Sequence, residues 1–158
     1  MRVISRDPGQ KPGWVELGAA GTLIRASHKW ESWCAPADPW DLAVTEGQWW
    51  YPGTDTDPNN LFKLAFDAGW SLRGIPAKRY MRIPPKVWRG GSGVDKATMQ
   101  RRILTTLSTP EKKLFAGIPA SRHGDVLDAI GIGRGALANL TTATYDWPGK
   151  GYERIPTP

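Results

Sequence analysis

At 158 residues the chain has room for one compact domain, whose core is large enough to fold without covalent cross-links. Hydrophobic residues make up 40% of it and charged residues 23%, and the lack of a run of about 18 apolar residues excludes a membrane-spanning helix. The single Cys34 cannot form an internal disulfide, and one cysteine with two histidines is too few for a thiol-based structural zinc site. We therefore expect a cytoplasmic protein.

The chain is basic, with a net charge of +6 and a pI of about 9.7. Nine of its 21 lysines and arginines lie between Arg73 and Arg102, where Asp95 is the single acid. Such a segment is typical of a surface that faces the phosphates of a nucleic acid. A solvated basic face with no polyanionic partner explains the same composition equally well.

The first half of the chain predicts four short strands. Residues 2–6 form a strand that the Asp7-Pro8-Gly9 turn ends, and residues 14–17 and 22–26 continue an antiparallel meander. Residues 29–40 contain two prolines and no helical period, which predicts a loop. The short apolar run at residues 41–47 predicts the fourth strand.

The second half predicts three helices and one more strand. Asp57 followed by Pro58 is a typical helix start, and an apolar stripe runs from there to Gly74. Residues 78–83 predict the fifth strand, and residues 90–93 a glycine-rich loop. The last two helices are expected over residues 95–107, with Met99, Ile103, Leu104 and Leu107 on the apolar side, and from a capping Ser121 onward.

These elements predict an α/β domain over residues 1–140, followed by a polar tail at residues 141–158 that is rich in proline and glycine. Strands that alternate with helices after the first hairpins imply parallel pairing. We therefore expect a mixed five-stranded sheet, an antiparallel meander joined to parallel strands, flanked by helices.

Four carboxylates stand at element ends or on one helix face. Asp7 follows the first strand, Glu46 ends the fourth, and Asp125 and Asp128 are three residues apart on the last helix. If the two strands are neighbours and the helix packs across their ends, the four acids converge. Clustered carboxylates need a cation, and hard oxygen ligands favour Mg²⁺ or Mn²⁺. Taken singly, each acid also has a structural reading, as a turn residue or part of a solvated helix face.

Three motifs in order resemble those of the RuvC-type Holliday junction resolvases (crossover junction endodeoxyribonucleases) of the ribonuclease H-like superfamily. The stretch from Ile4 to Val15, with Asp-Pro-Gly at a strand end, is similar to their opening motif. Val44-Thr45-Glu46 resembles their second acidic strand, and Asp125-Val126-Leu127-Asp128-Ala129 their final helix motif. The resemblance covers residues 2 to 138 and implies a ribonuclease H-like fold. The compact length suggests a phage-type member, and we expect it to work in a bacterial cell or a phage-infected host.

The resemblance implies a homodimeric endonuclease that binds two Mg²⁺ ions, for which Mn²⁺ can substitute, and cuts four-way DNA junctions in paired symmetric nicks. It assigns catalysis and metal binding to Asp7, Glu46, Asp125 and Asp128, and a catalytic role beside the phosphate to Lys86. The aromatic three residues past the second acid would insert at the junction crossover. The expected DNA-binding residues are Trp49, Trp50, Arg79, Arg82, Lys86, Arg89 and Lys96.

The chain also departs from the family pattern. Residues 29–40 are too short and proline-containing for the long helix that the family carries between its third and fourth strands. Arg6 stands where the family prefers an apolar residue, and glycines at positions 131, 133 and 135 are expected to weaken the last helix. The alternatives are a related nuclease that acts on other branched DNA or on RNA–DNA hybrids, and a DNA-binding module of the same fold without catalysis. We expect the apolar surface of the helix from Pro58 to Leu72 to form the dimer interface; it carries Leu61, Phe62, Leu64, Ala65, Phe66 and Ala68.

Overall fold

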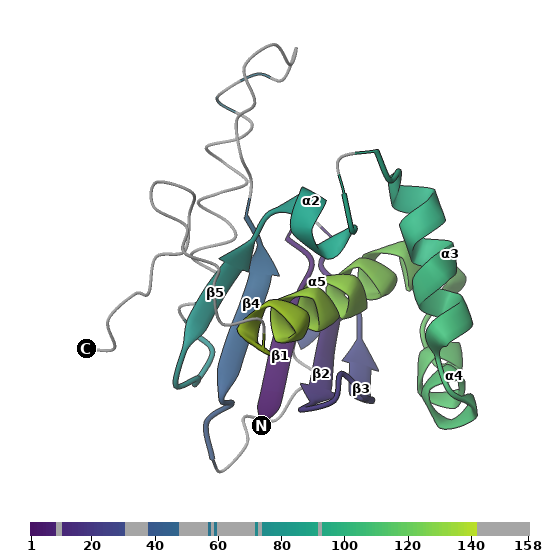
Figure 1. Ribbon diagram of the computed structural model, residues 1–158. Helices are drawn as coiled ribbons and strands as arrows, with labels where there is room; N and C mark the ends of the chain where they lie inside the picture. The colour runs from purple at the N-terminus through teal and green to yellow at the C-terminus, as the bar shows by residue number, and fades with distance from the viewer. Residues whose placement is uncertain are drawn as a thin grey trace.

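The computed structural model describes residues 1–8, 11–30, 38–47, 57, 59, 72, 74–91 and 93–141 (Figure 1). The strands are β1 (Arg2–Arg6), β2 (Trp14–Gly18), β3 (Leu23–Ser27), β4 (Leu42–Glu46) and β5 (Tyr80–Ile83). The helices are α2 (Pro85–Trp88), α3 (Lys96–Thr106), α4 (Thr109–Ala116), the short 3-10 helix η2 (Ala120–Arg122) and α5 (His123–Thr141).

The strands form one mixed sheet in the order β3-β2-β1-β4-β5. β1, β2 and β3 make the antiparallel meander, whereas β1 pairs with β4 and β4 with β5 in parallel. The prediction of a mixed five-stranded sheet is confirmed, and the strand bounds agree with the predicted ones to within about two residues.

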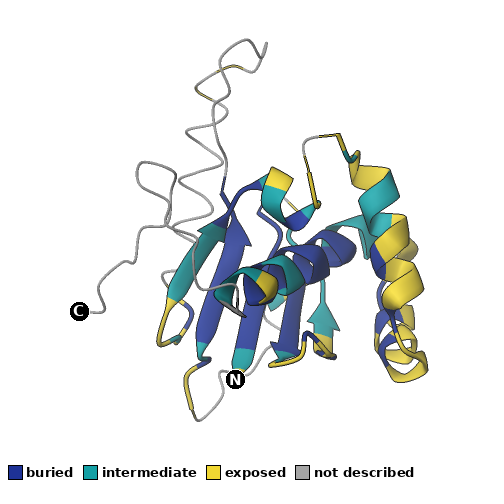
Figure 2. Cartoon of the chain, viewed as in Figure 1, coloured by how far each residue is buried: buried dark blue, intermediate teal, exposed yellow. Residues whose placement is uncertain are grey.

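Helix α5 lies across one face of the sheet, and the core between them is almost fully buried (Figure 2). The helix comes close because it carries glycines: a Cβ at Gly133 would lie 2.5 Å from Leu17 Cδ1, and one at Gly131 would lie 2.7 Å from the Trp88 ring. The expectation that these glycines weaken the helix overlooks this role. Tertiary packing compensates for their low helix propensity.

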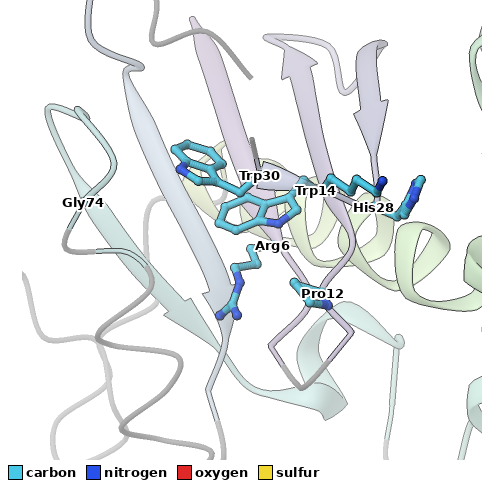
Figure 3. Close-up of a pocket in the computed structure, with 7 residues that line it drawn as sticks. Arg6, Pro12, Trp14, His28, Trp30 and Gly74 are labelled. Carbon is cyan, nitrogen blue, oxygen red and sulfur yellow. The ribbon is translucent and has the colours of Figure 1, made fainter. Parts of the chain in front are cut away.

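The opposite face of the sheet carries a second apolar cluster, built largely of tryptophan. The Trp14 and Trp30 rings lie side by side with centroids 4.5 Å apart (Figure 3). The Trp30 centroid is also 6.4 Å from that of Trp40. The Arg6 guanidinium stands 5.2 Å from the Trp14 ring and helps to line a cavity of about 370 Å³. Arg6 thus points to the face opposite α5, as strand alternation requires.

The helices differ from the predicted ones in four ways. Pro85, which was predicted to stop a strand, is also the first residue of α2. Helix α4 was not predicted, although Ser108 and Glu111 form a capping box at its start. Ser121 lies inside η2 rather than capping α5. On α3, which Asp95 caps, Leu104 is 40% exposed and not part of the apolar side.

Several sequence predictions fall outside the described residues. These are the loop at residues 31–37, all but single positions of the helix from Pro58 to Leu72, and the tail beyond Thr141. They stay predictions. In the part of the chain that is described, no helix is long and apolar enough to cross a membrane.

Candidate active site

Two acids stand side by side at the carboxyl ends of β1 and β4. In the parallel pairing of these strands Arg6 is opposite Thr45, so Asp7 and Glu46 occupy the next position on each strand. Because side chains alternate along a strand, Asp7 lies on the same face as Val3 and Ser5, the face that α5 covers. Both acids are buried, with 9% and 7% of their surface exposed.

Helix α5 brings a third acid to this edge of the sheet. Ser5 Oγ donates a hydrogen bond of 2.8 Å to the carbonyl oxygen of Ala129, which ties β1 to the helix directly beside Asp128. Asp128 is 1% exposed. Asp125, one turn earlier, is more open and pairs with Arg122, whose Nε lies 3.3 Å from Asp125 Oδ2.

The loop after Asp7 is pressed against the start of α5. A Cβ at Gly13 would lie 2.1 Å from the carbonyl oxygen of Asp125, a distance that no other residue type could accept without moving the backbone. The Asp7 backbone N–H donates to Gly13 O at 3.0 Å, and Arg122 Nη2 donates to Pro12 O at 3.2 Å. These contacts hold Asp7, Pro12 and Gly13 close to the start of α5.

Burial and mutual repulsion disfavour the charged forms of these acids. Burial raises the pKa of Asp7 to about 8, and the charges of Asp128, Glu46 and Asp125 act in the same direction, against Lys96. Burial also raises the pKa of Glu46 and that of Asp128. Grouped carboxylates with raised pKa values are typical of a functional centre, because stability alone gives no reason to bury them.

Specific donors face two of the acids. Asp128 accepts a hydrogen bond of 2.8 Å from Gln100 Nε2, and its Oδ2 lies 2.5 Å from Lys96 Nζ. Glu46 Oε2 accepts from Trp88 Nε1 at 3.0 Å and lies 3.9 Å from Arg89 Nη2. Residues of α2 and α3, together with Arg89, therefore supply positive charge and N–H groups that face Glu46 and Asp128.

The chemistry of the donor set fits a hard divalent cation. Carboxylate oxygens are the ligands that Mg²⁺ and Mn²⁺ prefer, and a bound cation would favour the charged form of Asp7, whose pKa is raised by burial and, in addition, by the charge of Asp128. Within the described ranges, no three His, Cys, Asp or Glu side chains are yet grouped tightly enough to hold an ion. In this arrangement Asp128 is paired with Lys96.

The structure thus places Asp7, Glu46 and Asp128 together, with Asp125 at the margin. Of the predicted basic residues, Lys96 and Arg89 reach the acids, whereas Lys86 is exposed on α2 and Arg79 and Arg82 lie at or next to β5. Trp49 and Trp50 lie outside the described residues. Three residues that contact the acids were not predicted from the sequence: Trp88, Gln100 and Arg122. Trp88 closely follows β5 and Arg122 closely precedes Asp125, but neither position, nor that of Gln100, carries a motif that would have identified it.

Lys96→Met is expected to destabilise the metal-free protein by about 1–2 kcal/mol, less than a fully buried pair would cost because Lys96 is half exposed. The substitution leaves Asp128 without its cation, so added Mn²⁺ should stabilise this variant more than the wild type. Thermal unfolding with EDTA and with Mn²⁺ measures both effects. Lys86→Met, on the exposed side of α2, is the matched control and should unfold like the wild type. Equal melting temperatures for the two variants would contradict the role of Lys96.

No protein-family model matches the sequence, and no curated protein is similar to it in sequence. The fold is similar to the solved structure of T. thermophilus RuvC in complex with a Holliday junction substrate. The two share 18% sequence identity with a TM-score of 0.50, over 90% of this chain and 96% of that one. This likeness, together with the strand order, confirms the predicted ribonuclease H-like fold.

Proposed function

We propose that this chain is a divalent-cation-dependent DNA endonuclease that resolves four-way junctions. The observation that carries the proposal is the meeting of Asp7, Glu46 and Asp128 at one edge of a sheet with the RuvC fold. The structure with which the fold is shared was solved with a Holliday junction. Buried acids that repel one another favour cation-dependent hydrolysis over a purely structural role.

Two Mg²⁺ ions bound by these acids would activate a water and stabilise the leaving oxygen of a phosphodiester, and Mn²⁺ would substitute. Asp7, Glu46 and Asp128 would hold the ions, with Asp125 as an outer ligand. Their burial excludes water from the carboxylates, which strengthens every electrostatic interaction there. Lys86, which we expect to act beside the reacting phosphate, has a side chain that is exposed and accessible to DNA.

The substrate proposal rests on the basic residues that surround and follow β5. Arg89 and Lys96 reach the acids, Lys86 is exposed on α2, Arg82 lies on β5, and Arg79 lies at the opposite end of that strand, beside Met1. All five are expected to contact phosphates of a branched DNA. Two copies of the chain would place one site on each of two strands, so that paired symmetric nicks follow from two-fold symmetry. The proposed dimer interface is the helix between Pro58 and Leu72.

The experiment that tests this function compares a mobile four-way junction, a linear duplex of the same sequence and an RNA–DNA hybrid, each incubated with the protein and Mg²⁺. We expect paired nicks in the junction and little cutting of the other two. Faster cleavage of the hybrid would identify a hybrid nuclease instead. Junction binding without cleavage, with Mg²⁺ or Mn²⁺, would identify a DNA-binding module, and either result would overturn the proposal.

Trp49→Ala is expected to lower junction cleavage about ten-fold or more, because a ring three residues past Glu46 could stack on a base unpaired at the branch point. Trp50→Ala, the matched control, should mainly lower stability. Cleavage rates per folded molecule and melting temperatures distinguish the two roles. The stacking role fails if Trp49→Ala lowers the melting temperature but leaves cleavage per folded molecule unchanged.

A further inference from the structure

The side chain of Trp88 connects the acid edge of the sheet to helix α5. It is 2% exposed, and its indole Nε1 donates a hydrogen bond of 3.0 Å to Glu46 Oε2. Trp88 lies at the end of α2, directly after β5, and Glu46 ends the neighbouring strand β4. The indole is therefore a donor that the fold brings to Glu46 from outside its own strand.

The ring has little freedom to move. The Trp88 side chain packs closely against two glycines of α5. A Cβ at Gly131 would lie 2.7 Å from Trp88 Cε3, and one at Gly135 would lie 2.6 Å from Trp88 Cβ. The Arg89 guanidinium also contacts the ring, 4.9 Å from its centroid, and lies 3.9 Å from Glu46 Oε2. Close packing against a helix and a neighbouring cation limits the directions in which the indole N–H can point.

This fixed donor contrasts with other buried tryptophans of the chain. Nε1 of Trp40, which is fully buried on the far face of the sheet, has no hydrogen-bond partner among the described residues, and neither has Nε1 of Trp14. Burying an indole N–H without a partner is costly, so hydrogen bonding does not explain those two positions. Trp88 is different because its N–H meets a carboxylate of the candidate metal centre.

We propose that Trp88 is a positioning residue: its N–H fixes the orientation of the Glu46 carboxylate so that this group can share a divalent cation with Asp7 and Asp128. The inference rests on the proposed function and deepens it. Hydrogen bonds to metal-ligating carboxylates orient the ligands, and removing such a partner typically lowers metal affinity about 10- to 100-fold. Trp88 would not touch the DNA or the cation itself.

The test is Mn²⁺ binding, measured by electron paramagnetic resonance of free MnCl₂ in the absence of DNA. Trp88→Phe removes the N–H and keeps an aromatic ring, and it should lower Mn²⁺ affinity at least ten-fold. Trp40→Phe is the matched control, since it removes the same atoms from a fully buried site without a carboxylate. It should lose stability to a similar degree but bind Mn²⁺ like the wild type.

A second variant covers the case in which Trp88→Phe does not fold. Gly131→Ala keeps the indole N–H but crowds the ring, so it should weaken Mn²⁺ binding in the same direction. The indole ¹⁵N–¹H signal of Trp88 is identified as the one that Gly131→Ala perturbs. Added Mg²⁺ should shift this signal in the wild type, and it should no longer do so in Asp7→Asn.

The outcomes separate the two proposals. Unchanged Mn²⁺ affinity in folded Trp88→Phe, or in Gly131→Ala, would overturn the positioning role while leaving the nuclease proposal intact. A wild-type protein that binds no Mn²⁺ and cuts no junction would overturn the proposed function, and the positioning role with it.

Discussion

Asp7→Asn, Glu46→Gln and Asp128→Asn are each expected to lower junction cleavage about a thousand-fold or more, while junction binding survives. The three acids are buried at one edge of the sheet, and each substitution would remove one of the proposed metal ligands. A thousand-fold loss corresponds to about 4 kcal/mol of transition-state stabilisation. Asp125→Asn should keep more activity, because this acid is more exposed and already pairs with Arg122.

The matched control is Asp41→Asn, which changes the same functional group at the opposite end of β4. Asp41 precedes the strand and pairs with Lys78 at 2.8 Å, away from the candidate site. It should cut and bind junctions like the wild type. Cleavage is measured in single-turnover assays and binding in the presence of Ca²⁺. Near-wild-type cutting by Asp7→Asn or Glu46→Gln would contradict the assignment of the metal ligands.

Asp7→Asn is also expected to stabilise the metal-free protein. The pKa of Asp7 in the folded state is raised from 3.8 to about 8, chiefly by burial. The stability that this group contributes is therefore fully present below about pH 4 and is lost as the pH rises toward 8. Each pKa unit corresponds to about 1.4 kcal/mol, so a shift of this size is worth several kcal/mol. Asparagine does not ionise and escapes this loss.

The measurement is the free energy of unfolding in EDTA at pH 5 and pH 8. The wild type should lose stability between the two values, and Asp7→Asn should lose much less and be the more stable protein at pH 8. Asp41→Asn again serves as the control. Lys78 and the Arg2 N–H lower the pKa of Asp41 to about 2, so the pKa shift of Asp41 is opposite in direction to that of Asp7 and its removal should not stabilise the protein at pH 8. Mg²⁺ should stabilise the wild type more than Asp7→Asn. An Asp7→Asn protein that is no more stable than the wild type at pH 8 would show that the ionisation of Asp7 does not lower the stability of the metal-free protein.

Much of the site could be predicted from the sequence because it depends on local patterns. The alternation of β1 and β4 places Asp7 and Glu46 on one face, and the order of the motifs brings the helix of Asp128 to the same edge. Short runs with clear turn signals also gave the five strands. Here periodicity and turn chemistry agree with the tertiary structure.

The parts that were missed depend on partners far away in the chain. The glycines at 131, 133 and 135 look unfavourable in an isolated helix, and they are explained by the close approach of Trp88 and of side chains from the sheet and α3. The contact of Lys96 with Asp128 was not predicted, and the expected role of Lys96 as a phosphate ligand stays a prediction. The capping box that begins α4 was local and could have been recognised from Ser108 and Glu111.

The central claim, that Asp7, Glu46 and Asp128 form a centre for divalent cations, is tested most directly by locating Mn²⁺ in crystals of the protein by anomalous diffraction. We expect Mn²⁺ peaks bounded by these three carboxylates, with Lys96 released from Asp128, and no such peaks in crystals of Asp7→Asn. Crystals soaked in Mn²⁺ that show no ion at these acids, and an intact ion pair between Lys96 and Asp128, would contradict the account.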